Sequence, residues 1–304
     1  MIAVTLNPAI DVTVLARELH LGAVNRVESG GRLPGGKGVN VAAALAREGH
    51  RVSAHGFLGR ENEAEFATFF DASGIADNCV RLPGATRMGI KIVDRARGET
   101  TDLNFPGLGP DDSALVELAA RIDAAEATWC VLAGSLPPGV PANFYASSIR
   151  RLKVRGVRVA LDTSGEALRI GLAAGPEVAK PNVHELEEIA GRRLPDTDSI
   201  VAAAKAIVAA GTGLVVVSRG AEGGCFVTAD AVVLARGPMI REGSTVGAGD
   251  AMVAGIVASR LEGLSLAECA RRATAYSLRA LAGTGTIAGW ADRVEIRRVG
   301  QSPA

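Results

Sequence analysis

Short apolar runs alternate with longer amphipathic stretches along most of this chain, and this alternation limits its fold more than any other feature. The apolar runs have the length and composition of buried strands, at Ile2–Leu6, Arg51–Gly56, Trp129–Ala133, Val157–Asp162 and Leu214–Ser218. The stretches between them have helical periodicity, at Val39–Arg47, Glu63–Ser73, Asp112–Ala124, Asn143–Val154, Ser199–Ala209, Asp250–Leu261 and Leu266–Leu281. Strands that alternate with helices predict an α/β fold, with a mostly parallel sheet covered by helices on both faces.

Two segments, residues 12–33 and 86–105, break this order because their apolar and polar residues alternate one by one. The second contains MGIKIVDRARGETTDLNF, with a hairpin turn expected at Arg97-Gly98. Such strands predict a small antiparallel sheet that projects from the main body. We find no internal repeat and no linker, so we expect residues 1–304 to form one domain that includes these segments.

Composition excludes several classes of partner. Lysine plus arginine equals aspartate plus glutamate at 33 each, so no overall field attracts nucleic acid or an anionic membrane. No apolar run approaches the length of a membrane span, and the start MIAVTL lacks the features of a signal peptide. The four cysteines lie far apart without a CxxC pair, as in a reduced cytoplasmic protein. An anionic ligand would therefore need a local cluster of cations.

The stretch GGRLPGGKG has the glycine and lysine spacing of a nucleotide-binding P-loop between Gly31 and Lys37. However, Gly38 stands where a P-loop needs Ser or Thr to hold Mg²⁺. The residues just upstream, 24–29, are half polar, whereas a P-loop follows a buried strand. The match fails at both points, which leaves Lys37 without a role from this motif.

The strongest motif is STVGAGDAMVAGIVASRL, residues 244–261, in which glycines precede an apolar helix. The amides of Gly247, Ala248 and Gly249 would be free to bind an anion at the helix start. Asp250 is then either the N-cap of this helix or the general base of a kinase. The motif alone leaves both interpretations open.

Two further motifs have the same ambiguity. In VAKPNVHELEEI, which contains Lys180, the step from Asn182 to Glu185 is either a capping box or a pair of oxygen ligands near Mg²⁺. In VVVSRGAEGG, Ser218 and its glycines form either an ordinary turn or a loop that approaches a nucleotide closely.

A fourth group of candidates lies mainly in the amino-terminal half. Asp11 follows the first strand, Asn40 lies in GGKGVN, and Ser135 lies in GSLPPG after a predicted strand. Arg26 and Arg87 lie on the two segments that break the strand and helix order. Exposed surface charge is the ordinary alternative for both arginines and for Lys37.

Together these motifs resemble one family. TLNPAID, GGKGVNVA, GSLPPG, KPNxxEL, SRGAEG and TVGAGD occur in the order and spacing of the phosphofructokinase B group of ribokinase-like sugar kinases, from residue 2 to about 290. VNRV, NPAID and TDLNFPG are most similar to the bacterial 1-phosphofructokinase branch. The resemblance implies a ribokinase-like three-layer α/β/α fold, with the two segments as a β lid that often pairs two subunits.

The resemblance also implies a role for each matched residue. It assigns Asp250 as catalytic base, with an anion hole formed by Gly247, Ala248 and Gly249. It assigns to ATP the residues Lys180, Asn182, Ser218, Gly220, Gly223 and Gly249, with Glu185 and Asn182 on the Mg²⁺ side. It assigns to the sugar hydroxyls Asp11, Gly35, Gly36 and Asn40, and to the sugar phosphate Arg26, Lys37 and Arg87 with Ser135 nearby. Asn104, a polar residue among apolar neighbours in TDLNFPG, is expected to face the pocket and to help distinguish phosphosugar isomers.

The expected activity is therefore ATP-dependent phosphorylation of fructose 1-phosphate to fructose 1,6-bisphosphate. Fructose 6-phosphate and tagatose 6-phosphate are alternative substrates within the same group. A non-catalytic sugar- or nucleotide-binding protein is the alternative of a different class, but it would be marked by a lost base or a broken anion hole. A nicotinamide dehydrogenase is disfavoured because no Gly-x-Gly-x-x-Gly turn follows the first strand.

Overall fold

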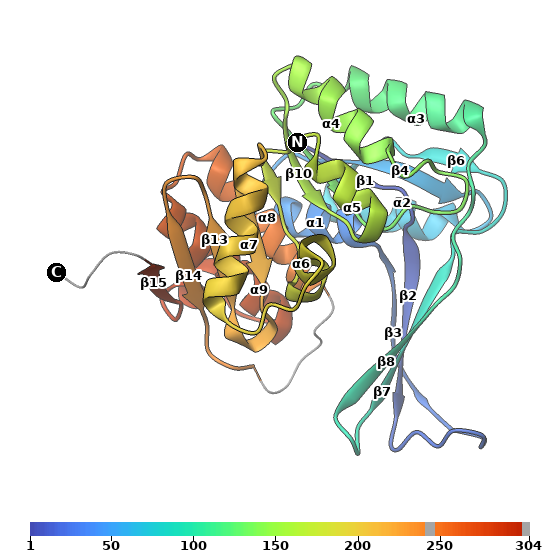
Figure 1. The fold of residues 1–304 in the computed structure, drawn as a ribbon. Helices are drawn as coiled ribbons and strands as arrows, with labels where there is room; N and C mark the ends of the chain where they lie inside the picture. The colour runs from blue at the N-terminus through green and yellow to red at the C-terminus, as the bar shows by residue number, and fades with distance from the viewer. Residues whose placement is uncertain (241–246, 300–304) are drawn as a thin grey trace.

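The computed structural model describes residues 1–240 and 247–299 and has the expected alternation of strands and helices (Figure 1). The main sheet contains, in spatial order, β15 (Glu295–Val299), β14 (Val232–Arg236), β13 (Gly224–Val227), β12 (Leu214–Ser218), β11 (Val178–Ala179), β10 (Arg158–Asp162), β9 (Trp129–Ala133), β1 (Ile2–Thr5), β4 (Ser53–Gly59) and β5 (Ala76–Asp77), with β6 (Val80–Leu82) also paired to β4. Strands β12 to β5 run parallel because helical crossovers return the chain to the same end of the sheet.

Strands β13, β14 and β15 extend the sheet in antiparallel orientation, which the sequence analysis did not predict. Each has only four or five residues, so periodicity alone gives little signal. These strands lie next to β12, and they enlarge the sheet on the side of the SRGAEG motif.

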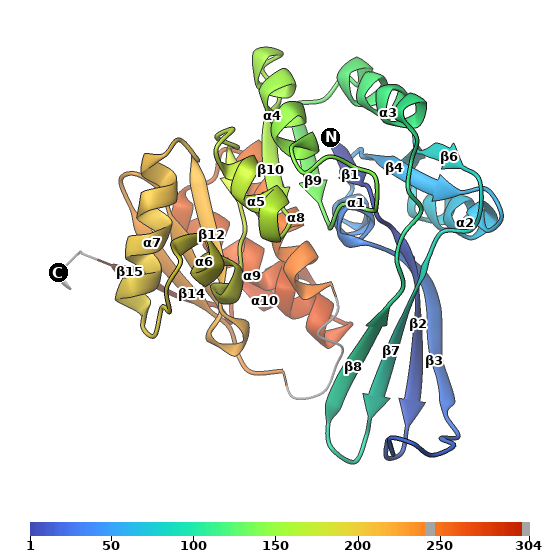
Figure 2. The same ribbon diagram turned by 45° about the vertical axis from the view of Figure 1, so that its right-hand side comes forward.

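Helices cover both faces of the sheet and form two separate apolar cores (Figure 2). One face carries α1 (Lys37–Arg47), α2 (Glu63–Ser73), α8 (Ala248–Leu261), α9 (Leu266–Ala282) and α10 (Ile287–Ala291). The other carries α3 (Asp112–Ala124), α4 (Phe144–Val154), α5 (Gly165–Leu172), α6 (Val183–Ala190) and α7 (Thr197–Ala209). The predicted three-layer fold is therefore confirmed. Helix α5 was not predicted, because it is short and contains glycine; burial of Leu168 and Leu172 stabilises it instead of intrinsic propensity.

A second sheet projects from the main body, as expected (Figures 1 and 2). It has the order β3-β2-β7-β8, with strands β2 (Ala9–Ala16), β3 (Glu28–Gly35), β7 (Met88–Asp94) and β8 (Glu99–Asn104). The two hairpins are antiparallel, but the central pair β2–β7 is parallel. Both hairpins leave the main body with their first strand, so these two strands run in the same direction. We call these four strands the projecting sheet.

Two further observations concern membrane-spanning helices and the state of the cysteines. No helix within residues 1–240 and 247–299 is both long and apolar enough to cross a membrane. All four cysteines are buried and have free thiols.

Candidate active site

Asp250 lies at the start of α8, where the helix meets the carboxyl ends of the parallel strands. Gly247 is the N-cap, in a left-handed conformation, and no side chain caps the helix. Asp250 is the third helical residue and is buried, so the alternative in which it is the N-cap is wrong. The first amides of α8 have no helical acceptor, as in any helix start. The predicted motif begins at Ser244, and its residues 244–246 lie outside the described residues.

Asn40 fixes the orientation of the Asp250 carboxylate. It projects from α1, and its Nδ2 donates a hydrogen bond of 2.8 Å to Asp250 Oδ2. Burial raises the pKa of Asp250 from an ordinary 3.8 to about 6, and the nearby negative charge of Asp162 contributes to the increase. The Asn40 hydrogen bond and two lysines act in the opposite direction. A carboxyl group with this pKa is mostly ionised at neutral pH and can still accept a proton.

Two lysines share one carboxylate beside Asp250. Lys37 Nζ lies 3.0 Å and Lys180 Nζ 3.4 Å from Asp162 Oδ1, at the carboxyl end of β10. Burial alone would lower the pKa of Lys37, but the negative charges of Asp162, Asp250 and Glu185 outweigh it and raise that pKa. Lys37 therefore stays charged next to the candidate base.

Sequence reasoning missed Asp162, which is only 1% exposed and whose Oδ2 has no hydrogen-bond partner among the described residues. A signal was available: it is the last residue of a predicted strand, and ligands bind beyond the carboxyl ends of parallel strands. The structure also gives Lys37 different neighbours from those predicted. Its ion pair is with Asp162, not among the arginines assigned to the sugar phosphate.

The predicted nucleotide residues lie in two groups. Ser218, Gly220, Gly223 and Gly249 line a pocket of about 340 Å³ between β12, α8 and α9. Most of its other lining is apolar, including Pro238, Ile240, Met252 and Leu278. A flat apolar ligand part such as a nucleobase would fit such a lining.

Lys180, Asn182 and Glu185 form the second group, at the start of α6. Glu185 N donates to Asn182 Oδ1, and Asn182 N donates to Glu185 Oε2, both at 2.8 Å. The capping-box interpretation is therefore confirmed. The negative charge of Glu185 also contributes to the raised pKa of Lys37. Among the described residues, no group of three His, Cys, Asp or Glu side chains forms a preformed metal cage.

The base of the projecting sheet provides a polar surface on the other side of the site. Asp11 on β2 pairs in register with Gly89 on β7, which pairs with Asn104 on β8. A Cβ atom at Gly89 would lie 2.7 Å from Asp11 Oδ1 and 3.4 Å from Asn104 Oδ1, so only glycine leaves this surface open. Lys91, which the sequence analysis did not single out, holds Asp11 with an Nζ–Oδ2 distance of 3.3 Å.

Arg87 is the cation of this surface. Its guanidinium donates to Asn104 Oδ1 at 3.3 Å and to the carbonyl oxygen of Asn7 at 3.2 Å. Asn7 Nδ2 in turn donates to Ser135 Oγ at 3.2 Å, which connects Arg87 with the GSLPPG loop. Burial lowers the pKa of Arg87 slightly from its usual high value, and its Nε has no hydrogen-bond partner among the described residues. An arginine with spare donors suits a phosphate. Asn104 is exposed at the end of β8, and its amide oxygen accepts from Arg87.

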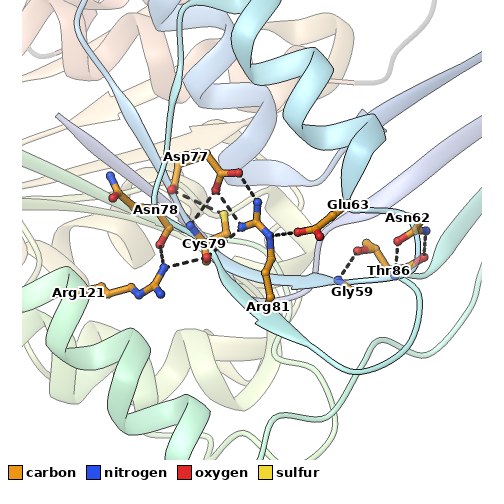
Figure 3. Close-up of polar contacts among 10 residues, drawn as sticks. Gly59, Asn62, Glu63, Asp77, Asn78, Cys79, Arg81, Thr86 and Arg121 are labelled. Carbon is orange, nitrogen blue, oxygen red and sulfur yellow. Dashed lines mark hydrogen bonds and ion pairs between the residues drawn. The ribbon is translucent and has the colours of Figure 1, made fainter.

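A polar clamp holds the chain just before Arg87, as Figure 3 shows. Thr86 N donates to Asn62 Oδ1 at 2.8 Å, and Asn62 Nδ2 donates to Thr86 O at 2.9 Å. Gly59 N donates to Thr86 Oγ1 at 2.8 Å. A Cβ atom at Gly59 would lie 2.3 Å from Thr86 N, so the end of β4 and the segment before β7 meet here without side-chain space. The clamp fixes the position of Arg87 on the main body.

The sequence analysis assigned Arg26 to the sugar phosphate together with Arg87. Within its own chain, however, Arg26 lies far from the surface around Arg87. It is exposed on the loop between β2 and β3. The hairpin pairs Ala9 with Gly35 at its base and Leu15 with Glu28 at its far end. Six residues of strand at about 3.3 Å each put the far end roughly 20 Å from the base. The alternation of residues 12–33 predicted the strands correctly but not which end would carry Arg26.

The remaining predicted residues lie where α1 begins. Gly35 ends β3, Gly36 is the N-cap of α1, and Lys37 is its first helical residue. The glycines of GGKG therefore place Lys37 and Asn40 on the first turns of this helix, between the projecting sheet and α8.

Comparison with known proteins gives consistent matches over nearly the whole chain. The sequence pattern of the pfkB family of carbohydrate kinases matches residues 4–293. A 1-phosphofructokinase of Rhodobacter capsulatus is 49% identical over 285 residues, 93% of this chain and 90% of that protein. A 1-phosphofructokinase of Xanthomonas campestris is 45% identical over 284 residues, 91% of this chain and 89% of that protein.

Two solved structures are also similar to this chain over nearly its whole length. Phosphofructokinase-2 of Escherichia coli in complex with fructose-6-phosphate is similar with a TM-score of 0.89 and 28% identity, over 96% of this chain and 97% of that chain. The tetrameric inhibited form of that protein also has a TM-score of 0.89, with 29% identity over 96% of this chain and 97% of that chain.

Proposed function

This chain belongs to the pfkB family of carbohydrate kinases, and from that membership we propose which reaction it performs and with which residues. It is an ATP-dependent sugar-phosphate kinase that converts fructose 1-phosphate to fructose 1,6-bisphosphate. The observation that carries the residue assignment is Asp250, a buried carboxylate at the uncapped start of α8. It lies between an apolar pocket on one side and a cationic, hydroxyl-binding surface on the other.

Asp250 acts as the general base. As the C6 oxygen of the sugar attacks the γ-phosphorus of ATP, its proton passes to the Asp250 carboxylate, and the bond to the bridging oxygen of ADP breaks. Asn40 keeps the carboxylate in position through its 2.8 Å hydrogen bond. The free amides at Gly247, Ala248 and Gly249 face the charge that develops on the phosphoryl oxygens.

Lys180 and Lys37 bind different phosphoryl groups. Lys180 lies against α8, 3.5 Å from the position of a Cβ atom at Gly249, and it serves the nucleotide phosphates. Lys37, at the first turn of α1, serves the phosphoryl group in transit. Asp162 holds both ammonium groups in place before substrates bind.

Mg²⁺ would neutralise charge on the β- and γ-phosphates when it binds with ATP. The residues at the α6 start fit this ion, since Asn182 and Glu185 offer oxygen atoms to its retained waters. The unpartnered Oδ2 of Asp162 adds a further oxygen acceptor among the described residues.

The phosphosugar binds between α1 and the projecting sheet. Arg87, supported by Asn104 and Asn7, takes the C1 phosphate, and Ser135 lies next to it through Asn7. Asp11 and the open backbone at Gly35 and Gly89 take the sugar hydroxyls. With both ends of the sugar held, the ring hydroxyls decide between isomers, and unpaired buried polar groups can discriminate by about 10⁴ in favourable sites.

We also propose that two copies pair through the projecting sheet to form a homodimer. Large apolar side chains are exposed on its strands, including Leu33 at 64% and Leu103 at 48%, and Leu21 on the loop between β2 and β3 is 92% exposed. Exposed apolar groups of this extent mark interaction surfaces. The pairing would bring the loop that carries Arg26 to the partner's site. Because a relative also has a tetrameric form, sedimentation is needed to measure the stoichiometry. Free buried thiols fit a cytoplasmic enzyme.

A coupled ADP-release assay tests the proposed reaction with fructose 1-phosphate, fructose 6-phosphate and tagatose 6-phosphate. We expect fructose 1-phosphate to have the highest kcat/KM. Equal or better turnover of fructose 6-phosphate, the sugar bound to the Escherichia coli relative, would overturn the substrate assignment and leave the kinase assignment intact. Absence of ADP release with every phosphosugar would overturn both.

A further inference from the structure

Lys91 lies on the face of the projecting sheet that carries the candidate sugar-binding residues, and the proposed reaction gives it no role. Asp11 on β2 pairs in register with Gly89 on β7, and Lys91 follows two residues later on β7. Side chains two residues apart on a strand point to the same face of a sheet. Gly89 pairs with Asn104 on β8, and Lys91 pairs with Asp102. Lys91 therefore shares one face with Asp11, Asn104 and Asp102.

The ammonium group of Lys91 lies between two carboxylates on this face. Its Nζ is 3.3 Å from Asp11 Oδ2 and 3.8 Å from Asp102 Oδ1. The two contacts are unequal, because the Asp11 side chain is 22% exposed and the Asp102 side chain is 53% exposed. The Lys91 side chain itself is only 15% exposed. Lys91 therefore pairs mainly with the carboxylate that the proposed function assigns to the sugar hydroxyls.

Glycines beside Asp11 leave its carboxylate without packing against either oxygen. A Cβ atom at Gly89 would lie 2.7 Å from Asp11 Oδ1, and one at Gly35 would lie 2.8 Å from Asp11 Oδ2. Side-chain packing at these two positions therefore cannot fix the carboxylate, whereas the ion pair with Lys91 can. A carboxylate has about four acceptor positions, so Asp11 can bind Lys91 and still accept from sugar hydroxyls.

We propose that Lys91 is a positioning residue for the phosphosugar, which holds the Asp11 carboxylate where the sugar hydroxyls bind and does not itself bind the phosphate. This inference rests on the proposed assignment of Asp11 to the sugar hydroxyls. Because two carboxylates face one ammonium, this part of the surface is net negative. Like charges repel, so it suits hydroxyl donors and leaves the phosphate to Arg87.

Three variants test the role of Lys91. Lys91→Met removes the ammonium and keeps most of the stem, and Lys91→Arg keeps a cation. Lys205→Met removes an exposed lysine of α7 as a matched control. Binding is measured by calorimetry on the full chain without nucleotide, so the result does not depend on kinase activity. The probe is whichever of fructose 1-phosphate and fructose 6-phosphate binds the unmodified protein more tightly, and KM for phosphosugar and ATP is measured in parallel.

We expect Lys91→Met to weaken phosphosugar binding and to raise its KM roughly 5- to 50-fold, as for the loss of a partly exposed hydrogen bond between charged groups. KM for ATP should stay within about twofold, because the contacts of Lys91 lie on the projecting sheet. Lys91→Arg should recover part of the affinity, and Lys205→Met should bind within about twofold of the unmodified protein. Unchanged phosphosugar affinity in Lys91→Met, or an equal rise in KM for ATP, would overturn the proposal.

Two further variants separate positioning from direct attraction and from sheet stability. If Lys91 acts through Asp11, then Lys91→Met should add little to the loss of affinity in an Asp11→Asn background. A full further loss there would mean that Lys91 attracts the phosphosugar directly and would overturn the proposal. Asp102→Asn removes the other carboxylate and should leave phosphosugar affinity within about twofold. A loss equal to that of Lys91→Met would mean that Lys91 only joins two strands, which would also overturn it.

The binding measurement distinguishes this inference from the proposed function. If phosphosugar binding depends on Lys91 through Asp11 but no phosphosugar is turned over, the inference stands and the proposed function fails. If the phosphosugar is turned over and binds Lys91→Met normally, the proposed function stands and the inference fails. If neither phosphosugar binds the unmodified protein, both fail.

Discussion

At the scale of single residues, the pKa of Asp250 determines how kcat/KM should depend on pH. Asp250 must be ionised to accept the sugar proton, and burial raises its pKa to about 6. We therefore expect kcat/KM for the phosphosugar to rise with pH through about 6 and then level off, since this ratio reports the free enzyme. Asp250→Asn should lower kcat by about two to four orders of magnitude and leave ATP affinity within a few-fold. Near-normal kcat in this variant would contradict the assignment.

The same pKa makes a prediction for stability. Because the pKa of Asp250 in the folded protein is raised above the ordinary 3.8, the unfolded chain loses this proton at lower pH than the folded protein. The free energy of unfolding therefore falls as pH rises from about 4 to 6 on account of this group. Asp250→Asn should raise the melting temperature at pH 7 but not at pH 3. Equal changes at both pH values would indicate a packing effect instead.

A substitution at Asp162 provides a further test of the pKa of Asp250. The negative charge of Asp162 contributes to the raised pKa of Asp250, while Lys37 and Lys180 lower it. Asp162→Asn leaves the two lysines and removes the opposing charge, so the inflection in the kcat/KM profile should move to lower pH. Asp112→Asn, on the exposed first turn of α3, removes a distant carboxylate and should leave the inflection unchanged. A shift to higher pH in Asp162→Asn would contradict this electrostatic account.

Residue chemistry was predictable from the sequence where a local motif carried it. Asp250 and the glycines before it form one contiguous motif, and the structure excludes the N-cap alternative. Asp162 was missed because its partner Lys37 is 125 residues away, and no local pattern marks a contact of that kind. Arg26 was placed correctly on a strand-forming segment, but the register that puts it at the far end comes from long-range pairing.

At the scale of elements, the clamp between Asn62 and Thr86 allows a test of how Arg87 is positioned. Asn62 occupies the N-cap position of α2 but makes no cap hydrogen bond, because both ends of its amide bind Thr86. Asn62→Ala should therefore raise KM for the phosphosugar about 5- to 30-fold, as for the loss of buried hydrogen bonds, with KM for ATP unchanged. Asn143→Ala is a matched control, since Asn143 is the exposed, non-bonding N-cap of α4.

A double-mutant cycle separates positioning from general destabilisation. If Asn62 acts through Arg87, then Asn62→Ala should add little to KM for the phosphosugar in an Arg87→Ala background. Additive effects, or an equal rise in KM for ATP, would mean that the clamp only stabilises the fold. Asn62→Asp keeps the acceptor for Thr86 N–H and should recover part of the affinity.

Elements were predicted best where their periodicity was long. The stretch predicted as Asp250–Leu261 begins two residues earlier in the structure, because Ala248 and Gly249 also adopt helical geometry. Strands β13 to β15 were missed because each is short and gains stability only from its neighbours. The parallel pairing of β2 with β7 likewise depends on where both strands leave the main body.

At the scale of the whole molecule, the projecting sheet decides whether one chain contains a complete site. Arg26 lies at the far end of this sheet, roughly 20 Å from the base of the hairpin by strand length. A phosphate contact by Arg26 therefore requires a second copy, as in an isologous pair in which each sheet reaches the other subunit. The sequence alone could not show this, because exposure and distance appear only after folding.

Mixing two defective variants tests this arrangement. Arg26→Ala should raise KM for the phosphosugar, and Asp250→Asn should abolish turnover, each when pure. In a hybrid dimer, the Arg26→Ala subunit retains its base and receives Arg26 from the Asp250→Asn subunit, so one of the two sites is complete. Random exchange makes half of the dimers hybrid, so about a quarter of the unmodified activity should return at low phosphosugar concentration. If Arg26 acted within its own chain, or only as exposed surface charge, mixing would restore nothing. Co-purification of the second variant with an affinity-tagged first variant would show whether subunits had exchanged.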